Sequence, residues 1–240
     1  MPDAAGMPEL IAHRGASRER IENTLPAFAR ALEHGADGIE LDVHATRNGI
    51  VVVHHDRLPR GTSEEPSLLG VPIAELSLKE IRLVSLAPNT GVPTLAQVLR
   101  AVRPPTRLYI EIKARGIESA VVETIRAAPE PERCAVHGFD HRVVPNVHAM
   151  APDIAGGILS TSYPIDAAHE LRAAGARDYW MWWEHIDAAL CDSVHAAGGR
   201  IVAWTVNDPV AAARLAALGV DGLCTDDVPA LRAALTEASA

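Results

Sequence analysis

The sequence has few cysteines, and their positions exclude several kinds of site. Cys134, Cys191 and Cys224 are the three cysteines of the 240-residue chain. They lie far apart, without the close pairs typical of zinc sites and redox motifs, and their odd number argues against a disulfide framework. We therefore expect a protein of a reducing compartment, the cytoplasm.

The sequence also lacks long hydrophobic runs. No stretch approaches the roughly 18–20 consecutive apolar residues that a transmembrane helix needs. The first ten residues include Asp3 and Glu9 and contain no apolar run, so they do not resemble a secretory signal. We expect neither an integral membrane segment nor a cleaved leader.

Positive charge is in short supply as well. The chain has 22 lysines and arginines against 31 aspartates and glutamates, a formal net charge of −9. This balance argues against a broad nucleic-acid surface, which would need a basic face. It does not exclude an anionic substrate, because a bound metal ion can reverse the field within one cleft.

Short apolar runs alternate with Ala- and Leu-rich amphipathic segments about eight times along the chain. This alternation is typical of βαβ units around a parallel sheet, and the chain length suits one (β/α)₈ barrel. No glycine-rich phosphate loop follows the first run, which argues against a nucleotide-binding sheet. We therefore predict an α/β protein, a TIM barrel, as a single domain over residues 1–240. The expected strands are Leu10–Gly15, Gly38–Thr46, Arg107–Lys113, Cys134–Asp140, Ile154–Ser160, Asp178–Trp183, Arg200–Val206 and Gly222–Asp226.

One region departs from this period. A short extra strand is expected at Ile50–His55, after the turn that follows the second barrel strand. A polar, proline-punctuated insertion then runs over about residues 57–93. We predict helices at Ile73–Val84 and Thr94–Val102.

Acidic side chains gather on two of the predicted strands. Alternation along a strand puts Glu40 and Asp42 on one face of the second strand, and Glu111 occupies the equivalent face of the third. The outer face of a barrel lies beneath helices, where unpaired carboxylates are costly, so these side chains should point inward. They could form salt bridges within the barrel, but three gathered carboxylates favour one divalent cation. Oxygen ligands select Mg²⁺ or Ca²⁺, with Mn²⁺ as a further candidate, over zinc.

Two histidines at strand ends and two cationic residues complete the predicted site. His13 ends the first strand and His55 ends the extra strand, and such a pair can act as general acid and general base. His54 should face the opposite way. Arg14 and Lys113 could hold phosphate oxygens, or they could simply neutralise the carboxylates.

The ordered set of motifs resembles the glycerophosphodiester phosphodiesterase family over nearly the whole chain. The motifs are His13-Arg14-Gly15, Glu22-Asn23-Thr24, Glu40-x-Asp42, His55-Asp56, Glu111-x-Lys113, Gly138-Phe139-Asp140, Trp204-Thr205-Val206-Asn207, Asp221-Gly222 and Thr225-Asp226. Four departures from the family pattern are Ile21, Asn48, Gly138 and the stretch Arg60-Gly61-Thr62. The last of these leaves the specificity for the alcohol open.

The resemblance implies a function and assigns roles to residues. It implies a metal-dependent hydrolase that converts a small-molecule glycerophosphodiester to glycerol 3-phosphate and an alcohol. By this resemblance His13 and His55 are the acid and base, while Glu40, Asp42 and Glu111 bind the metal. Arg14 and Lys113 contact the phosphate, and Trp204 lies near the substrate.

Alternative functions remain open at this point. The alcohol could be a lysophospholipid, or intramolecular attack could leave a cyclic phosphate. A non-catalytic phosphoester-binding barrel, or an unrelated metal-dependent aldolase or isomerase, fits the residues less well. The sequence indicates no oligomeric state.

Overall fold

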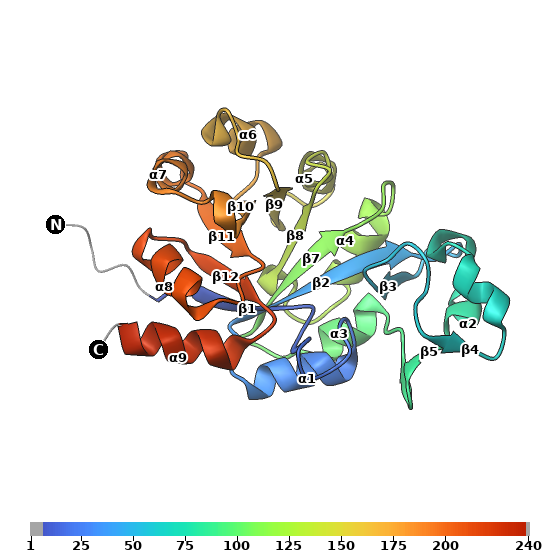
Figure 1. The fold of residues 1–240 in the computed structure, drawn as a ribbon. Helices are drawn as coiled ribbons and strands as arrows, with labels where there is room; N and C mark the ends of the chain where they lie inside the picture. The colour runs from blue at the N-terminus through green and yellow to red at the C-terminus, as the bar shows by residue number, and fades with distance from the viewer. Residues whose placement is uncertain (1–6, 239–240) are drawn as a thin grey trace.

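The computed structural model describes residues 7–238. Within this range parallel strands close into a barrel, with β1 pairing both β2 and β12, which confirms the predicted TIM barrel (Figure 1). Residues 1–6, part of the segment in which we expect no leader, lie outside the described residues. The barrel strands are β1 (Glu9–His13), β2 (Gly38–Ala45), β7 (Arg107–Ile112), β8 (Cys134–Gly138), β9 (Ala155–Ser160), β10 (Asp178–Trp182), β11 (Arg200–Trp204) and β12 (Gly222–Thr225).

Helices surround the barrel; all but α9, which follows the last strand, lie between successive strands in the sequence (Figure 1). The first begins where Thr24 caps it, the threonine side chain accepting a hydrogen bond from the backbone of Ala27. Its apolar face, which includes Phe28, packs against the strands. The helices are α1 (Leu25–Glu33), α3 (Leu95–Ala101), α4 (Glu118–Arg126), α5 (Val143–His148), α6 (Ala167–Ala174), α7 (Ala188–Ala196), α8 (Pro209–Ala217) and α9 (Val228–Ala238).

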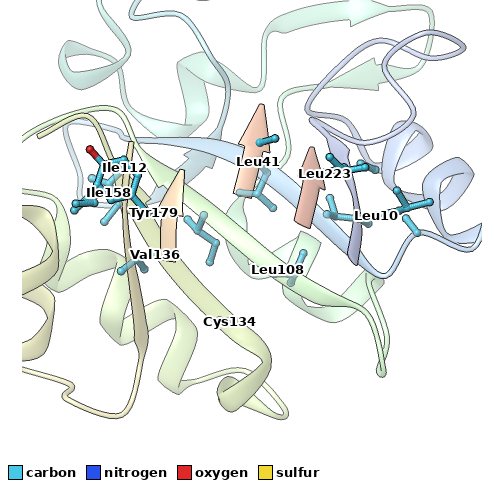
Figure 2. Close-up of a cluster of buried hydrophobic side chains, with 14 of the residues drawn as sticks. Leu10, Leu41, Leu108, Ile112, Cys134, Val136, Ile158, Tyr179 and Leu223 are labelled. Atoms are coloured by element: carbon cyan, nitrogen blue, oxygen red, sulfur yellow. The ribbon is translucent and has the colours of Figure 1, made fainter. Parts of the chain in front are cut away.

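Alternation along the strands divides the apolar core into two parts. Side chains such as Leu10, Leu41 and Val136 point outward and pack beneath the helices (Figure 2). A smaller cluster, which includes Tyr109 and Trp180, fills the barrel interior. The strand side chains of the outer cluster are almost all aliphatic, and so the carboxylates of β2 point into the barrel, as expected.

Charged side chains close the amino-terminal end of the barrel. Arg200 donates hydrogen bonds to Glu9 at 2.7 Å and to Asp178 at 3.4 Å, and the Tyr109 hydroxyl donates to Glu9 at 2.8 Å. Burial, together with the Glu9 carboxylate, raises the pKa of Tyr109 to about 12. This network leaves the opposite, carboxyl-terminal end as the open mouth.

The insertion forms a separate layer beside the barrel, seen around β4 and β5 in Figure 1. Strand β3 (Val51–Val53) pairs antiparallel with β2, which confirms the extra strand. A three-stranded sheet follows in the order β4 (Thr62–Ser63), β5 (Val84–Ala87) and β6 (Thr90–Gly91). Its apolar residues, with Ile73 and Val84 among them, make a small core of their own with Val52 of β3.

The helix predicted at Ile73–Val84 is wrong as a continuous element. The chain forms a 3-10 turn at Ile73–Glu75, then the four-residue helix α2 (Leu78–Ile81), and enters β5 at Val84. Ser77 causes the break, because it caps α2 in a reciprocal capping box with Glu80. The helix predicted at Thr94–Val102 is confirmed as α3.

None of the helices within residues 7–238 is long and apolar enough to cross a membrane.

Candidate active site

A cavity of about 200 Å³ opens at the carboxyl-terminal end of the barrel, where enzymes of this fold hold their catalytic residues. It brings together seven of the eight residues that the sequence singled out, and the eighth, Asp42, contacts two of them. Its lining residues are His13, Arg14, Glu40, His55, Glu111, Lys113, His137, Phe139, Leu159, Trp180, Trp204 and Cys224.

The three carboxylates lie on neighbouring strands. Asp42 of β2 is the register partner of Glu111 of β7, and Glu40 lies two residues before Asp42 on the same face. All three are buried. Burial raises the pKa of Glu40 well above its usual range, and the nearby Asp42 and Glu111 carboxylates add to the effect. Burial and Asp42 likewise raise the pKa of Glu111.

Asp42 differs from the two glutamates because cations and an amide surround it. Arg14 Nε lies 3.2 Å from Asp42 Oδ2, and Lys113 Nζ lies 3.5 Å from Oδ1. The Asn23 side chain donates to Oδ2 at 2.8 Å and accepts from the Asp42 backbone at 3.2 Å. Burial opposes ionisation, but these contacts lower the pKa of Asp42.

Arg14 is placed by an unusual backbone. Its φ of +57° is in the left-handed region, and its amide nitrogen donates to both the backbone and the side chain of Glu40. Gly15 follows with φ +85°, where a Cβ would lie 2.8 Å from the Ala27 backbone. The guanidinium also donates two hydrogen bonds to Glu22. The His-Arg-Gly motif therefore needs its glycine for geometry.

Lys113 reaches the cavity from the end of β7. Its Nζ donates to Glu111 Oε1 at 2.8 Å, and it lies 5.8 Å from the centroid of the Phe139 ring. The neighbouring carboxylates raise the pKa of Lys113 against the effect of burial, so the ammonium stays charged. Of the two roles considered for this residue, neutralisation is the one visible in these contacts.

His13 is held by a carboxylate from the other end of the chain. Its Nδ1 lies 2.7 Å from Asp226 Oδ1. Asp226 also accepts hydrogen bonds from Ser17 Oγ at 3.0 Å and from Asn207 Nδ2 at 2.7 Å. Burial would raise the pKa of Asp226, but these hydrogen bonds lower it to about 2. An ionised Asp226 directs the Nδ1 proton of His13 toward itself and leaves Nε2 for chemistry.

The second histidine has a similar arrangement. His55 lines the cavity, and its Nδ1 lies 2.7 Å from Asp56 Oδ1. Asp56 is in turn paired with Arg60. His54 faces away, as the alternation predicts: it is buried and its Nε2 contacts the backbone of Arg60 and of Leu58.

A third histidine lies deeper in the site. His137 of β8 is 1% exposed, and its ring stacks on Trp180 with the centroids 4.4 Å apart. Burial lowers the pKa of His137 to about 3, so the imidazole is neutral. Its Nε2 lies 3.9 Å from Glu40 Oε1.

Aromatic rings form one wall of the mouth. Trp204 packs edge-on against Phe139 and against Trp182, with centroid distances of 5.5 Å and 5.6 Å. Phe139 is 48% exposed, so the wall continues to the surface. Trp204 lines the cavity, and Phe139 extends that aromatic surface.

The residues present fit a divalent cation. Asp42 Oδ1 and both ring nitrogens of His137 are buried and have no hydrogen-bond partner in the described part of the chain. Glu40, Glu111 and His137 each offer a ligand atom within 4.8 Å of the others. Two buried carboxylates have raised pKa values and lie close to polar atoms without partners. This pattern is expected where a bound cation would supply positive charge.

A larger hollow, of about 1120 Å³, lies at the other end of the barrel. Its arginines are paired with carboxylates, as Arg200 is with Glu9 and Arg232 is with Asp37. It contains none of the residues just described, so we assign the chemistry to the smaller cavity at the mouth.

Sequence reasoning missed several residues of the site. Asn23, Asn207 and Asp226 were part of the quoted motifs but were given no role, and His137 was not considered. For His137 the signal was available, because alternation along β8 puts it on the same face as Phe139. The partner of His13 had no such signal, because Asp226 is 213 residues away.

Comparisons with known proteins agree with this geometry. A model of the glycerophosphoryl diester phosphodiesterase family matches residues 13–230. The chain belongs to the glycerophosphodiester phosphodiesterase family. The prediction of an enzyme of this class, a phosphoric diester hydrolase, is therefore confirmed.

Individual relatives cover most of the chain. A glycerophosphodiester phosphodiesterase of Caldanaerobacter subterraneus subsp. tengcongensis is 32% identical over 91% of this chain and 93% of its own length. A probable glycerophosphodiester phosphodiesterase 1 of Mycobacterium tuberculosis is 45% identical over 85% of this chain and 84% of its own.

Solved structures show the same fold. A glycerophosphodiester phosphodiesterase from Thermotoga maritima is 26% identical with a TM-score of 0.78, covering 92% of this chain and 96% of its own. A phosphodiesterase from Oleispira antarctica, solved with the product sn-glycerol-3-phosphate, has a TM-score of 0.87 at 24% identity, with coverage of 96% and 97%.

Proposed function

We propose that this member of the family hydrolyses glycerophosphodiesters to glycerol 3-phosphate and an alcohol, using one divalent cation and acid–base catalysis by His13 and His55. The observation that carries the proposal is the cavity at the mouth. It brings two histidines, each backed by its own carboxylate, to the same space as buried acidic residues and two cationic side chains. The product held by the Oleispira antarctica neighbour supports the choice of substrate.

Arg14 and Lys113 would bind the non-bridging phosphate oxygens. Both line the cavity, and both remain charged at neutral pH. Arginine can offer two parallel N–H groups and lysine a compact charge, so together they would stabilise charge that grows on phosphate in the transition state. Trp204 and Phe139 would support the apolar side of the substrate.

The two histidines would move the protons. One takes a proton from the attacking oxygen, while the other gives a proton to the departing alkoxide, so that water and diester become monoester and alcohol. Each Nδ1 is held by a carboxylate, which leaves Nε2 to act. We assign the acid role to His55, because it lies beside the insertion, on the side where the alcohol would leave.

Glu40, Asp42 and Glu111 would hold the cation, with Mg²⁺, Ca²⁺ and Mn²⁺ as the candidates. When bound, such a cation supplies electrostatic stabilisation of the phosphate oxygens.

The buried and free cysteines among the described residues support a reducing, cytoplasmic setting, which cell fractionation would test.

Turnover and product analysis test the proposal. The protein would be given glycerophosphocholine, glycerophosphoinositol or a lysophospholipid, each with Mg²⁺, Ca²⁺ or Mn²⁺, and products would be followed by phosphorus NMR. We expect glycerol 3-phosphate from the first two and loss of activity after exhaustive treatment with EDTA. A stable cyclic phosphate as the product, or a lysophospholipid as the preferred substrate, would contradict the proposed reaction. Full activity after chelation would show that the reaction needs no cation.

A further inference from the structure

His137 is a buried histidine for which the acid–base chemistry has no use. Its side chain is 1% exposed, and neither ring nitrogen has a hydrogen-bond partner within residues 7–238. Leaving a buried polar group unpaired is destabilising, so native proteins rarely do so without a reason. A hydrophobic residue at this position would avoid the cost.

The position of the ring is fixed by its neighbours. It stacks on Trp180 with an interplanar angle of 15°. Gly157, its register partner on β9, makes room: a Cβ there would lie 3.2 Å from the His137 Cβ and 3.0 Å from the Trp180 Nε1. The imidazole is thus held in one orientation rather than filling space loosely.

That orientation directs the ring toward two carboxylates. His137 is the register partner of Glu111 on β7, and its Nε2 lies 3.9 Å from Glu40 Oε1. Ligand atoms from the three residues all lie within 4.8 Å of one another. Ligands bound at about 2.1–2.4 Å from one ion are at most about 4.8 Å apart, so a single ion can contact all three.

The charges favour the same conclusion. Arg14 and Lys113 both lie against Asp42, and Lys113 also pairs with Glu111. Glu40 receives a backbone N–H from Arg14, and the neutral imidazole of His137 lies beside it, with Nε2 3.9 Å from Glu40 Oε1. A water molecule could bridge His137 and Glu40, but it would add no positive charge beside the three buried carboxylates.

We infer that His137 is a direct nitrogen ligand of the cation held by Glu40 and Glu111, so that the site is a mixed nitrogen–oxygen site rather than an all-oxygen one. The inference rests on the cation of the proposed function and adds a ligand to it. Imidazole favours transition metals over Mg²⁺ and Ca²⁺. The site should therefore prefer Mn²⁺ or a later divalent ion of the first transition row to Ca²⁺.

Electron spin-echo envelope modulation of the Mn²⁺-loaded full-length protein tests the inference directly. A histidine nitrogen bound to Mn²⁺ gives a ¹⁴N coupling that oxygen ligands do not. The variants are His137→Gln, which replaces nitrogen by a carbonyl oxygen, and His148→Gln, a matched control on α5 whose ring contacts the Ile154 backbone. We expect the ¹⁴N coupling in the wild type and in His148→Gln, and its loss in His137→Gln.

Calorimetric titration of the apo proteins adds affinities. Removing the nitrogen ligand should weaken Mn²⁺ binding by about tenfold or more, since even indirect partners of a metal contribute 10–100-fold. Ca²⁺ binding should change less, because the glutamine carbonyl is an acceptable ligand for a hard ion. The affinity for Mn²⁺ relative to that for Ca²⁺ should therefore fall in His137→Gln and stay unchanged in His148→Gln.

The outcomes separate this inference from the proposed function. Mn²⁺ bound to the wild type without a ¹⁴N coupling, or a coupling that survives in His137→Gln, overturns the ligand but leaves the cation in place. Failure of the wild type to bind any of these cations, with activity resistant to chelation, overturns both. If His137→Gln does not fold, the wild-type spectrum and a His137→Asn variant decide the question.

Discussion

Replacing Asp226 by asparagine should reverse the hydrogen bond that holds His13. Asn207 donates its amide to Asp226 Oδ2 at 2.7 Å and accepts from the Asp226 backbone at 2.9 Å, which fixes how the Asn207 amide is turned. In the Asp226→Asn variant the new carbonyl must face Asn207, so the new NH₂ must face His13 Nδ1. His13 can accept that hydrogen bond only with its own proton on Nε2, where a general base needs a lone pair.

The size of the effect follows from the same contacts. The pKa of Asp226 falls from an ordinary 3.8 to about 2, and a shift of this size corresponds to about 2.5 kcal/mol. Three side chains contribute to this stabilisation of the carboxylate, and solvent weakens it because the carboxylate is 26% exposed. The contribution of His13 in the resting enzyme is therefore about 1 kcal/mol. The wrong tautomer adds to this loss during reaction. We expect kcat to fall about 10–100-fold, at about 1.4 kcal/mol for each factor of ten.

Steady-state hydrolysis of glycerophosphocholine, followed through glycerol 3-phosphate release, measures this effect. KM should stay within about twofold, because the substrate would still find its phosphate-binding residues. Ser17→Ala is the matched control: it removes one hydrogen bond from the same carboxylate without changing the tautomer of His13, and should cost only a few-fold. The reasoning is refuted if Asp226→Asn keeps kcat within threefold of the wild type, or changes KM alone.

Four further predictions concern catalysis and stability. His55→Ala should lower kcat for glycerophosphocholine by roughly 10²–10⁴, and His54→Ala far less, because only the former lines the cavity. If His55 is the acid, His55→Ala should lower the hydrolysis rate of a p-nitrophenyl diester less than His13→Ala does, because this leaving group needs no proton. Equal losses of rate in the two variants would contradict separate roles. Arg200→Met should lower the free energy of unfolding by about 2–3 kcal/mol in urea titrations, because it removes one cationic partner from the largely buried Glu9 and Asp178 carboxylates. An unchanged free energy of unfolding would count against that network. The stabilisation by Asp226 relative to Asp226→Asn should be full above about pH 4 and be lost as the pH falls through about 2, since the folded pKa lies below the unfolded one. A difference that stays undiminished down to pH 2 would exclude ionisation as its source.

The barrel could be predicted because two layers of packing leave a strong pattern in the sequence. Every barrel strand buries an outer face of apolar residues beneath the helices, so runs such as Gly38–Thr46 stand out, and their bounds agree with the structure to within one or two residues. The insertion could not be predicted equally well. Its apolar residues from Ile73 to Val84 are spaced as in a helix, but they pack on a small separate core from three short elements.

The site divides in the same way. Glu40, Asp42 and Glu111 could be placed because alternation on one strand and the common end of parallel strands are local rules. Asp226 could not, because its contact with His13 depends on β12 closing the ring beside β1. The fourth-strand histidine, His137, required only that the alternation rule be applied once more.

The contacts of the charged residues suggest why cation and substrate should depend on one another. Arg14 and Lys113, the two residues available for phosphate, both lie against Asp42 in this structure. They cannot turn fully toward a phosphodiester without leaving a buried carboxylate unpaired, which costs several kcal/mol. A divalent cation held by Asp42 and the neighbouring glutamates would offset that cost and release both side chains for the phosphate. By linkage, a bound phosphodiester would then strengthen cation binding to the same degree as the cation strengthens substrate binding. The salt bridges seen here are therefore compatible with a phosphate-binding role for Arg14 and Lys113, because they describe where these residues rest before both ligands arrive.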